Sequence, residues 1–130
     1  MPKNSLSYPK VCKRKDGKYY IDFKLNNKRY RLTLCIMDRN NLLKEIKNLD
    51  DGWTLIEHAL ARDFTFKNFN VALDFINRIG IESDNLNHHP KIVNVYNKVR
   101  LELWSHDIDS ISSRDIDLAK LVDEVFRANF

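Results

Sequence analysis

The stretch NFNVALDFINRIGIESDNLNHHP, residues 68–90, decides the fold. Its apolar residues recur every three or four positions, which is the spacing of one helix face. Asn68 suits the N-cap of a helix, and Pro90 cannot continue one. We therefore expect a helix over residues 68–86 that ends before the histidine pair next to Pro90. Its apolar face is predicted to contain Phe69, Ala72, Leu73, Ile76, Ile79 and Gly80.

Extended segments lie on both sides of this helix. Residues 53–58 and 60–66 are predicted to form two strands, and residues 92–105 form a longer extended run after the proline. Tyr96 and Asn97 lie within that run, so we interpret them as mid-strand residues that serve the fold or an interface. A period of two places five apolar residues on one side of the run: Val93, Val95, Val99, Leu101 and Leu103.

Two further helices complete the pattern. The first covers about residues 39–48, and the last begins after Ser112, where Ser112 and Asp115 resemble a capping box. From residue 39 onward the order is therefore α-β-β-α-β-β-α, without regular βα alternation. This order favours a two-layer α+β fold, in which helices cover one face of an antiparallel sheet.

The N-terminal part of the chain differs from the rest in charge. Residues 1–35 contain ten Lys or Arg and two Asp, a net charge of +8, whereas residues 36–130 contain twelve Lys or Arg and sixteen Asp or Glu, a net charge of −4. Three strands are predicted in the basic part, joined by turns at Asp16-Gly17 and Asn26-Asn27. We therefore expect a basic three-stranded meander over residues 1–35 and a separate domain over residues 36–130.

Length and composition set the class of protein. The chain has 130 residues, of which 43% are hydrophobic and 31% charged, as in an ordinary globular domain. No apolar run has the length of about 18 residues or more that a membrane span needs, and the first ten residues contain no apolar core of a secretory signal. The two cysteines are too few for a disulfide framework. We expect a cytoplasmic protein without a membrane segment.

Three of the four histidines lie within nineteen residues: His88, His89 and His106. The first two are at a helix end and the third at a strand end, where side chains project from a scaffold. Three interpretations are open: a favourable interaction of histidine with the helix dipole, a three-histidine metal site, and an acid–base site. The metal interpretation has no support from HExxH-type spacing. The fourth histidine, His58, lies in a turn region without a comparable context.

The wider pattern resembles the pterin-4a-carbinolamine dehydratase family over about residues 37–130. The resemblance rests on five separated motifs: GW at 52–53, FTFKNF at 64–69, NHHP at 87–90, VYNKV at 95–99 and SRDIDLA at 113–119. It implies dehydration of 4a-hydroxytetrahydropterin, the product of aromatic amino-acid hydroxylases, to quinonoid dihydropterin. It further implies that the pterin is the substrate and that no metal or other cofactor is required.

The resemblance also implies roles for individual residues. The family's histidines fall on His88, His89 and His106, and we expect His88 and His106 to handle two protons while His89 orients the pterin. Asp84, one helical turn before His88, is expected to orient that imidazole or to bind the pterin. The remaining matched positions are expected to bind substrate (Asn87, Trp53, Trp104 and Ser105) or to support the site (Arg114 and Asp115).

Other functions and partners stay open. The first alternative is a non-catalytic, coactivator-type binding protein of the same fold, and the second is nucleic-acid binding through the basic meander. For the meander we prefer packing of its apolar face on the catalytic domain, but phosphate contact is an alternative. That contact would use Lys10, Lys13, Arg14, Lys15, Lys28, Arg29 and Arg31. The resemblance implies a homodimer or homotetramer and a link to a hydroxylase pathway.

Overall fold

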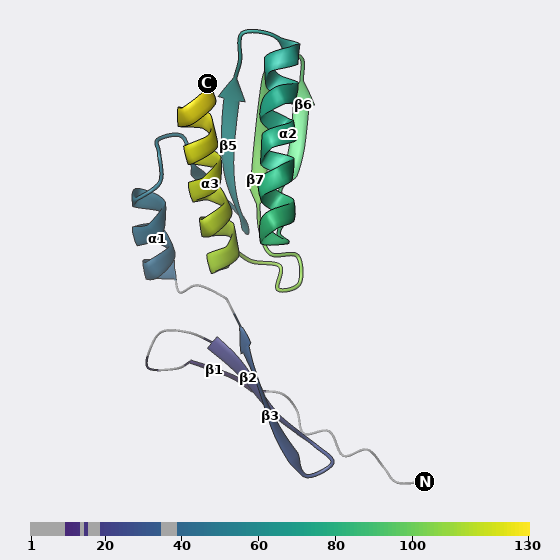
Figure 1. Cartoon of the computed structure of the whole chain (residues 1–130). Helices are drawn as coiled ribbons and strands as arrows, with labels where there is room; N and C mark the ends of the chain where they lie inside the picture. Colours follow the sequence, from purple (N-terminus) through teal and green to yellow (C-terminus); the bar gives the residue numbers. More distant parts are fainter. Residues whose placement is uncertain (1–9, 14, 16–18, 35–38) are drawn as a thin grey trace.

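The computed structural model describes residues 10–13, 15, 19–34 and 39–130. Four antiparallel strands form the larger sheet in the order β4-β5-β7-β6. Figure 1 shows α2 and α3 side by side on one face of this sheet. The predicted two-layer α+β fold is therefore confirmed. The bounds are α1 Arg39–Lys47, β4 Thr54–Ile56, β5 Ala59–Thr65, α2 Phe69–Leu86, β6 Lys91–Val95, β7 Lys98–Leu103 and α3 Ser113–Asn129.

Helix α2 begins and ends where its local sequence predicts. The Asn68 side chain accepts a hydrogen bond from the Val71 backbone N–H at 3.0 Å, as an N-cap residue does. At the other end Asn87 has a left-handed backbone with φ of 49°, and the His88 backbone N–H donates to the Ser83 carbonyl at 3.0 Å. This C-cap turns the chain sharply and directs the histidine pair away from the helix axis.

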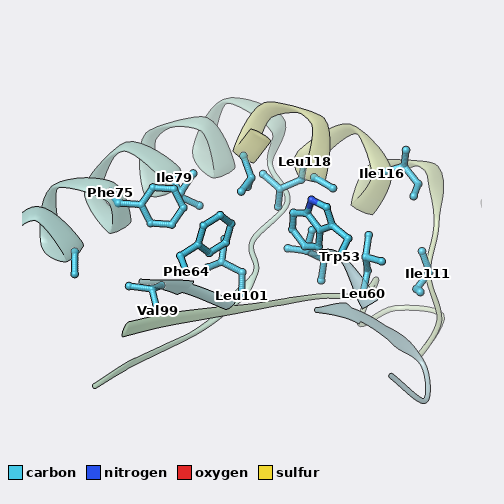
Figure 2. Close-up of a cluster of buried hydrophobic side chains, with 14 of the residues drawn as sticks. Trp53, Leu60, Phe64, Phe75, Ile79, Val99, Leu101, Ile111, Ile116 and Leu118 are labelled. Atoms are coloured by element: carbon cyan, nitrogen blue, oxygen red, sulfur yellow. The ribbon is translucent and has the colours of Figure 1, made fainter. Parts of the chain in front are cut away.

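The buried face of α2 differs from the predicted one. Phe69 and Leu73 are 43% and 37% exposed, whereas Phe75 is completely buried. Phe75 contacts Phe64 and Phe66 in an aromatic cluster that Phe126 completes. Figure 2 shows this core between the sheet and the two long helices. The buried face of α2 consists of Ala72, Phe75, Ile79 and Ser83.

The extended run after Pro90 is a hairpin, so the mid-strand interpretation of Tyr96 and Asn97 is wrong. Both residues lie in the turn between β6 and β7, and Tyr96 has a left-handed φ of 52°. The Asn97 side chain donates a hydrogen bond to the Phe66 carbonyl at 2.7 Å. Because the turn interrupts the period of two, Val93 and Val95 are exposed. The core positions of the hairpin are Val99, Leu101 and Leu103.

The basic meander forms a sheet of its own in the order β1-β2-β3. Its strands are β1 Lys10–Lys13, β2 Tyr19–Leu25 and β3 Lys28–Leu34. The expected packing of its apolar face on the domain of residues 36–130 stays a prediction. Arg14 and the Asp16-Gly17 turn lie outside the described residues. In the part of the chain that is described, no helix has the length and apolarity to cross a membrane.

A buried carboxylate joins α3 to the segment before the sheet. Asp123 is 2% exposed and accepts hydrogen bonds from Trp53 Nε1 at 2.8 Å, Arg62 Nη1 at 2.5 Å and the Asp50 backbone N–H at 2.9 Å. The Arg62 side chain is only 10% exposed. The attraction between Arg62 and Asp123 therefore offsets most of the cost of removing each charge from water.

Replacing Asp123 with Ala should strongly destabilise the fold, because Arg62 would keep a buried charge without its partner. We expect the free energy of unfolding to fall by about 3–5 kcal/mol, measured by denaturant unfolding. Glu124→Ala, at the exposed neighbouring position of the same helix, is the matched control and should change stability by less than about 0.5 kcal/mol. Equal stability of the two variants would contradict this assignment.

Candidate active site

The three histidines line one pocket of about 460 Å³ at the end of α2. They come from separate segments: His88 and His89 follow α2, and His106 follows β7. The described residues that line the pocket are Asn87, His88, His89, His106, Asp107 and Arg114. The structure therefore brings together the predicted catalytic histidines and two of the other predicted site residues, Asn87 and Arg114.

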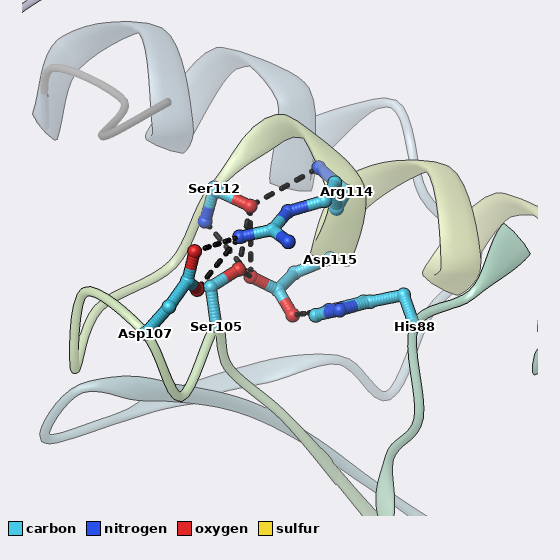
Figure 3. Close-up of polar contacts among 6 residues, drawn as sticks. All are labelled: His88, Ser105, Asp107, Ser112, Arg114 and Asp115. Carbon is cyan, nitrogen blue, oxygen red and sulfur yellow. Dashed lines mark hydrogen bonds and ion pairs between the residues drawn. The ribbon is translucent and has the colours of Figure 1, made fainter. Parts of the chain in front are cut away.

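His88 is buried and held by Asp115 at the start of α3. Its Nε2 lies 2.5 Å from Asp115 Oδ1. The other carboxylate oxygen, Oδ2, accepts hydrogen bonds from the Ser105 hydroxyl at 2.9 Å and the Ser112 backbone N–H at 2.8 Å. Figure 3 shows these contacts converging on the carboxylate. Asp115 itself is completely buried, so these donors replace its hydration.

This arrangement assigns the protons of the His88 ring. An ionised carboxylate only accepts hydrogen bonds, so the Nε2 of His88 is the donor to Asp115. Nδ1 is then the ring nitrogen that can take up or release a proton. The carboxylate also fixes the orientation of the ring, as in an Asp–His pair of a catalytic triad. The contact fits an acid–base role for His88.

The same carboxylate caps helix α3. Ser112 and Asp115 form the predicted capping box, which this structure confirms. The Ser112 hydroxyl also lies 2.6 Å from that of Ser105, and Ser105 pairs with Ser110 in an isolated β-bridge. These contacts tie the two ends of the loop between β7 and α3 together. Ser105 does not line the pocket and contacts Asp115 instead.

Asp84 contacts His89 instead of His88. Its Oδ1 lies 2.8 Å from His89 Nε2, so the expected orientation of His88 by Asp84 is wrong. Both partners of this pair are open to solvent, with side-chain exposures of 79% for Asp84 and 59% for His89. A pair of this kind is weak on its own. Of the two, His89 lines the pocket.

His106 belongs to an aromatic stack that the sequence did not reveal. Its ring lies parallel to the Trp104 indole, with 4.4 Å between centroids. His58 meets the edge of Trp104 at 5.6 Å and lies 3.7 Å from Asp109. Trp104 and His58 line a neighbouring cavity of about 480 Å³ rather than the histidine pocket. Trp104 therefore acts on the site by fixing the plane of His106.

Arg114 pairs with Asp107, a residue without a sequence-based assignment. Arg114 Nη2 lies 2.7 Å from Asp107 Oδ1. The Arg114 guanidinium, through this hydrogen bond, holds the pKa of the Asp107 carboxyl below its usual range. Arg114 Nε is buried without a hydrogen-bond partner among the described residues. This donor lies on a residue of the pocket wall.

Trp53, another predicted substrate-binding residue outside the pocket lining, lies in the interior. It is 7% exposed and belongs to the hydrophobic core, where its indole N–H binds Asp123. Within the described ranges, no group of three or more His, Cys, Asp or Glu side chains is arranged to hold a metal ion.

Comparisons with known proteins agree with the fold and show the family. The family model described as pterin 4 alpha carbinolamine dehydratase matches residues 36–125. A crystal structure of a transcriptional coactivator/pterin dehydratase from Brucella melitensis is similar, with a TM-score of 0.66 and 27% sequence identity. The similarity covers 69% of this chain and 97% of that chain.

The pair of Arg114 and Asp107 should make part of the stability depend on pH. Folding lowers the pKa of Asp107, so its contribution is present above the pKa of the unfolded chain and disappears as the pH falls through the lower, folded value. Arg114→Gln should return the pKa of Asp107 toward about 3.9, measured by NMR titration of the carboxyl carbon. The difference in unfolding free energy between wild type and this variant should shrink toward acidic pH.

Lys120→Gln on the same helix is the control for this titration. Lys120 pairs with Glu45 rather than with Asp107, so the pKa of Asp107 should not change in this variant. An Asp107 pKa that is the same in Arg114→Gln and wild type would contradict the assigned cause.

Proposed function

Because the chain belongs to the pterin-4α-carbinolamine dehydratase family, we propose that it converts 4a-hydroxytetrahydropterin to quinonoid dihydropterin and water. In this reaction the C4a–O bond breaks, the departing hydroxyl gains one proton and leaves as water, and N5 loses one proton. No electrons are exchanged with another molecule, so we propose no cofactor. The observation that carries the proposal is the pocket in which three histidines converge, one of them backed by the buried carboxylate of Asp115.

We assign the two proton transfers to His88 and His106. Support for His88 comes from its hydrogen bond to Asp115, which fixes the ring and leaves Nδ1 for proton exchange. Support for His106 comes from its parallel contact with Trp104, which fixes the ring plane. A proton-transfer group works best when its geometry is set before the substrate binds. The hydroxyl and N5 are adjacent on the pterin, so two groups in one pocket suit the reaction.

We assign pterin binding to the polar groups around these histidines. The pterin ring carries N–H donors and carbonyl and ring-nitrogen acceptors along its pyrimidine edge. His89 and Asn87 are exposed in the pocket lining and offer both donors and acceptors, and exposed Asp84 contacts His89 from beside the pocket. Arg114, which lines the pocket and pairs with Asp107, adds a positively charged group to its wall. Trp53, which binds Asp123 in the core, has no place in this assignment.

A second candidate function is a coactivator-type binding role. The similar Brucella melitensis protein is described as a transcriptional coactivator as well as a pterin dehydratase. A binding surface alone would not require three histidines to converge in one pocket. We therefore propose catalysis as the primary function.

Turnover of 4a-hydroxytetrahydropterin by the purified chain tests this function. Replacing His88 or His106 with Ala should lower kcat by about 10²–10⁴-fold, which is the range for one acid–base group. Asp115→Asn should lower kcat similarly, because the amide N–H₂ can favour the wrong tautomer of His88. Asp117→Asn is the matched control, since Asp117 is exposed on the same helix, and it should keep wild-type turnover.

Each outcome of this assay has a consequence. Absence of turnover in the wild-type chain would remove the catalytic proposal and favour the binding role. Full activity in both histidine variants would remove His88 and His106 from the mechanism. Turnover lost on treatment with a chelator and restored by zinc would favour the metal interpretation instead.

We propose that the chain assembles as a homodimer through the free edge of the larger sheet. β6 is an edge strand, and its Val93 and Val95 are 40% and 69% exposed. An unpaired edge with apolar residues favours pairing with a second copy. We expect a dimer at micromolar concentration by light scattering, and Val93→Lys with Val95→Lys should shift it toward monomer. A wild-type monomer under these conditions would contradict the proposal.

A further inference from the structure

The β2–β3 hairpin of the meander has one apolar and one basic face. Its register pairs Ile21 with Leu32 and Phe23 with Tyr30, and the rings of Phe23 and Tyr30 are stacked at 5.3 Å. Successive residues of a strand point to opposite faces. The residues between these positions therefore form the other face. We call it the basic face, and it comprises Tyr20, Asp22, Lys24, Arg29 and Arg31.

Three cations on the basic face surround a single carboxylate. Arg29 binds Asp22 with Nε at 2.8 Å and with Nη2, and Arg31 Nε lies 3.9 Å from the same carboxylate. Three positive charges against one negative charge leave a net charge of +2 on this face. The guanidinium side chains remain 57% and 59% exposed, whereas Asp22 is 16% exposed. Asp22 thus orders the two arginines without covering them.

An aromatic ring lies beside these cations. The Arg31 guanidinium is 5.4 Å from the centre of the Tyr20 ring, within the range of a cation–π contact. Guanidinium groups in a fixed plane bind phosphate with two parallel hydrogen bonds. The Tyr20 ring beside Arg31 adds a surface on which a base can stack. The face therefore combines the two elements that recognise a nucleic-acid strand.

We propose that the basic face of the meander binds the phosphate backbone of a nucleic acid. The charge of the whole chain favours this partner, since residues 1–35 carry +8 and residues 36–130 carry −4. A polyanion would be attracted to the meander and repelled by the remaining domain. This inference does not depend on the proposed dehydratase activity.

Fluorescence anisotropy of the full chain with labelled duplex DNA, single-stranded DNA and RNA tests the inference. We expect dissociation constants of about 10⁻⁶ M or tighter at about 50 mM salt, with affinity falling steeply toward about 200 mM. Arg29→Gln with Arg31→Gln should lower the slope of log affinity against log salt by about two for duplex DNA. Pterin turnover should stay at the wild-type level in this variant.

Two further variants separate electrostatic binding from a structural effect. Lys67→Gln with Lys98→Gln removes the same charge from exposed positions of the other domain and should leave binding nearly unchanged. Asp22→Asn removes the negative charge of the basic face and should tighten binding.

Three results would overturn the inference. The first is wild-type protein without salt-dependent binding to any of the three probes. The second is equal loss of binding in the arginine and lysine double variants. The third is retention on phosphatidylserine vesicles without oligonucleotide binding, which would assign the face to a membrane surface.

Discussion

The carboxylate of Asp115 holds together three segments that are separate in the sequence. It binds His88 after α2, Ser105 after β7 and the Ser112 backbone at the start of α3. A completely buried charge is tolerated only when donors surround it, so these segments must meet for the carboxylate to be accommodated. The hydrogen bonds of this one carboxylate therefore cap α3, close the loop that precedes it and orient His88. The geometry of the pocket is for this reason a property of the fold itself.

Helix α3 carries a second buried carboxylate eight residues later. Asp123 binds Trp53 and Arg62, and the turns between the two aspartates pack Leu118, Ala119 and Val122 into the core. The helix is thus fixed by polar contacts at two levels and by apolar packing between them. Sites supported by a rigid element keep their geometry better than sites on loops alone.

Local signals in the sequence were sufficient to predict much of this structure. The Asn68 cap, the helix end before Pro90 and the box of Ser112 and Asp115 depend on residues within a few positions of each other. The predicted contact of Asp84 with His88 does not form, for a physical reason. A spacing of four residues brings two side chains together only while the helix continues. Asn87 adopts a left-handed conformation, which ends that alignment and directs His88 toward Asp115, 27 positions later.

Long-range contacts account for the other differences. Tyr96 is not a typical turn residue, and its turn is supported by Asn97, which bonds to Phe66 from 31 positions away. The stack of His58, Trp104 and His106 likewise joins the turn after β4 to the end of β7. Nothing in the spacing of these residues predicts such contacts, because they form only after the strands have paired.

The two tryptophans of the chain occupy contrasting environments. Trp53 is buried in the core beside Asp123, whereas Trp104 is half-buried and stacked on His106 at the rim of the pocket. An indole in contact with imidazole changes its emission when the imidazole becomes charged or when a ligand displaces it. The protein thus contains two intrinsic optical reporters, one for the integrity of its interior and one for events at the histidine cluster.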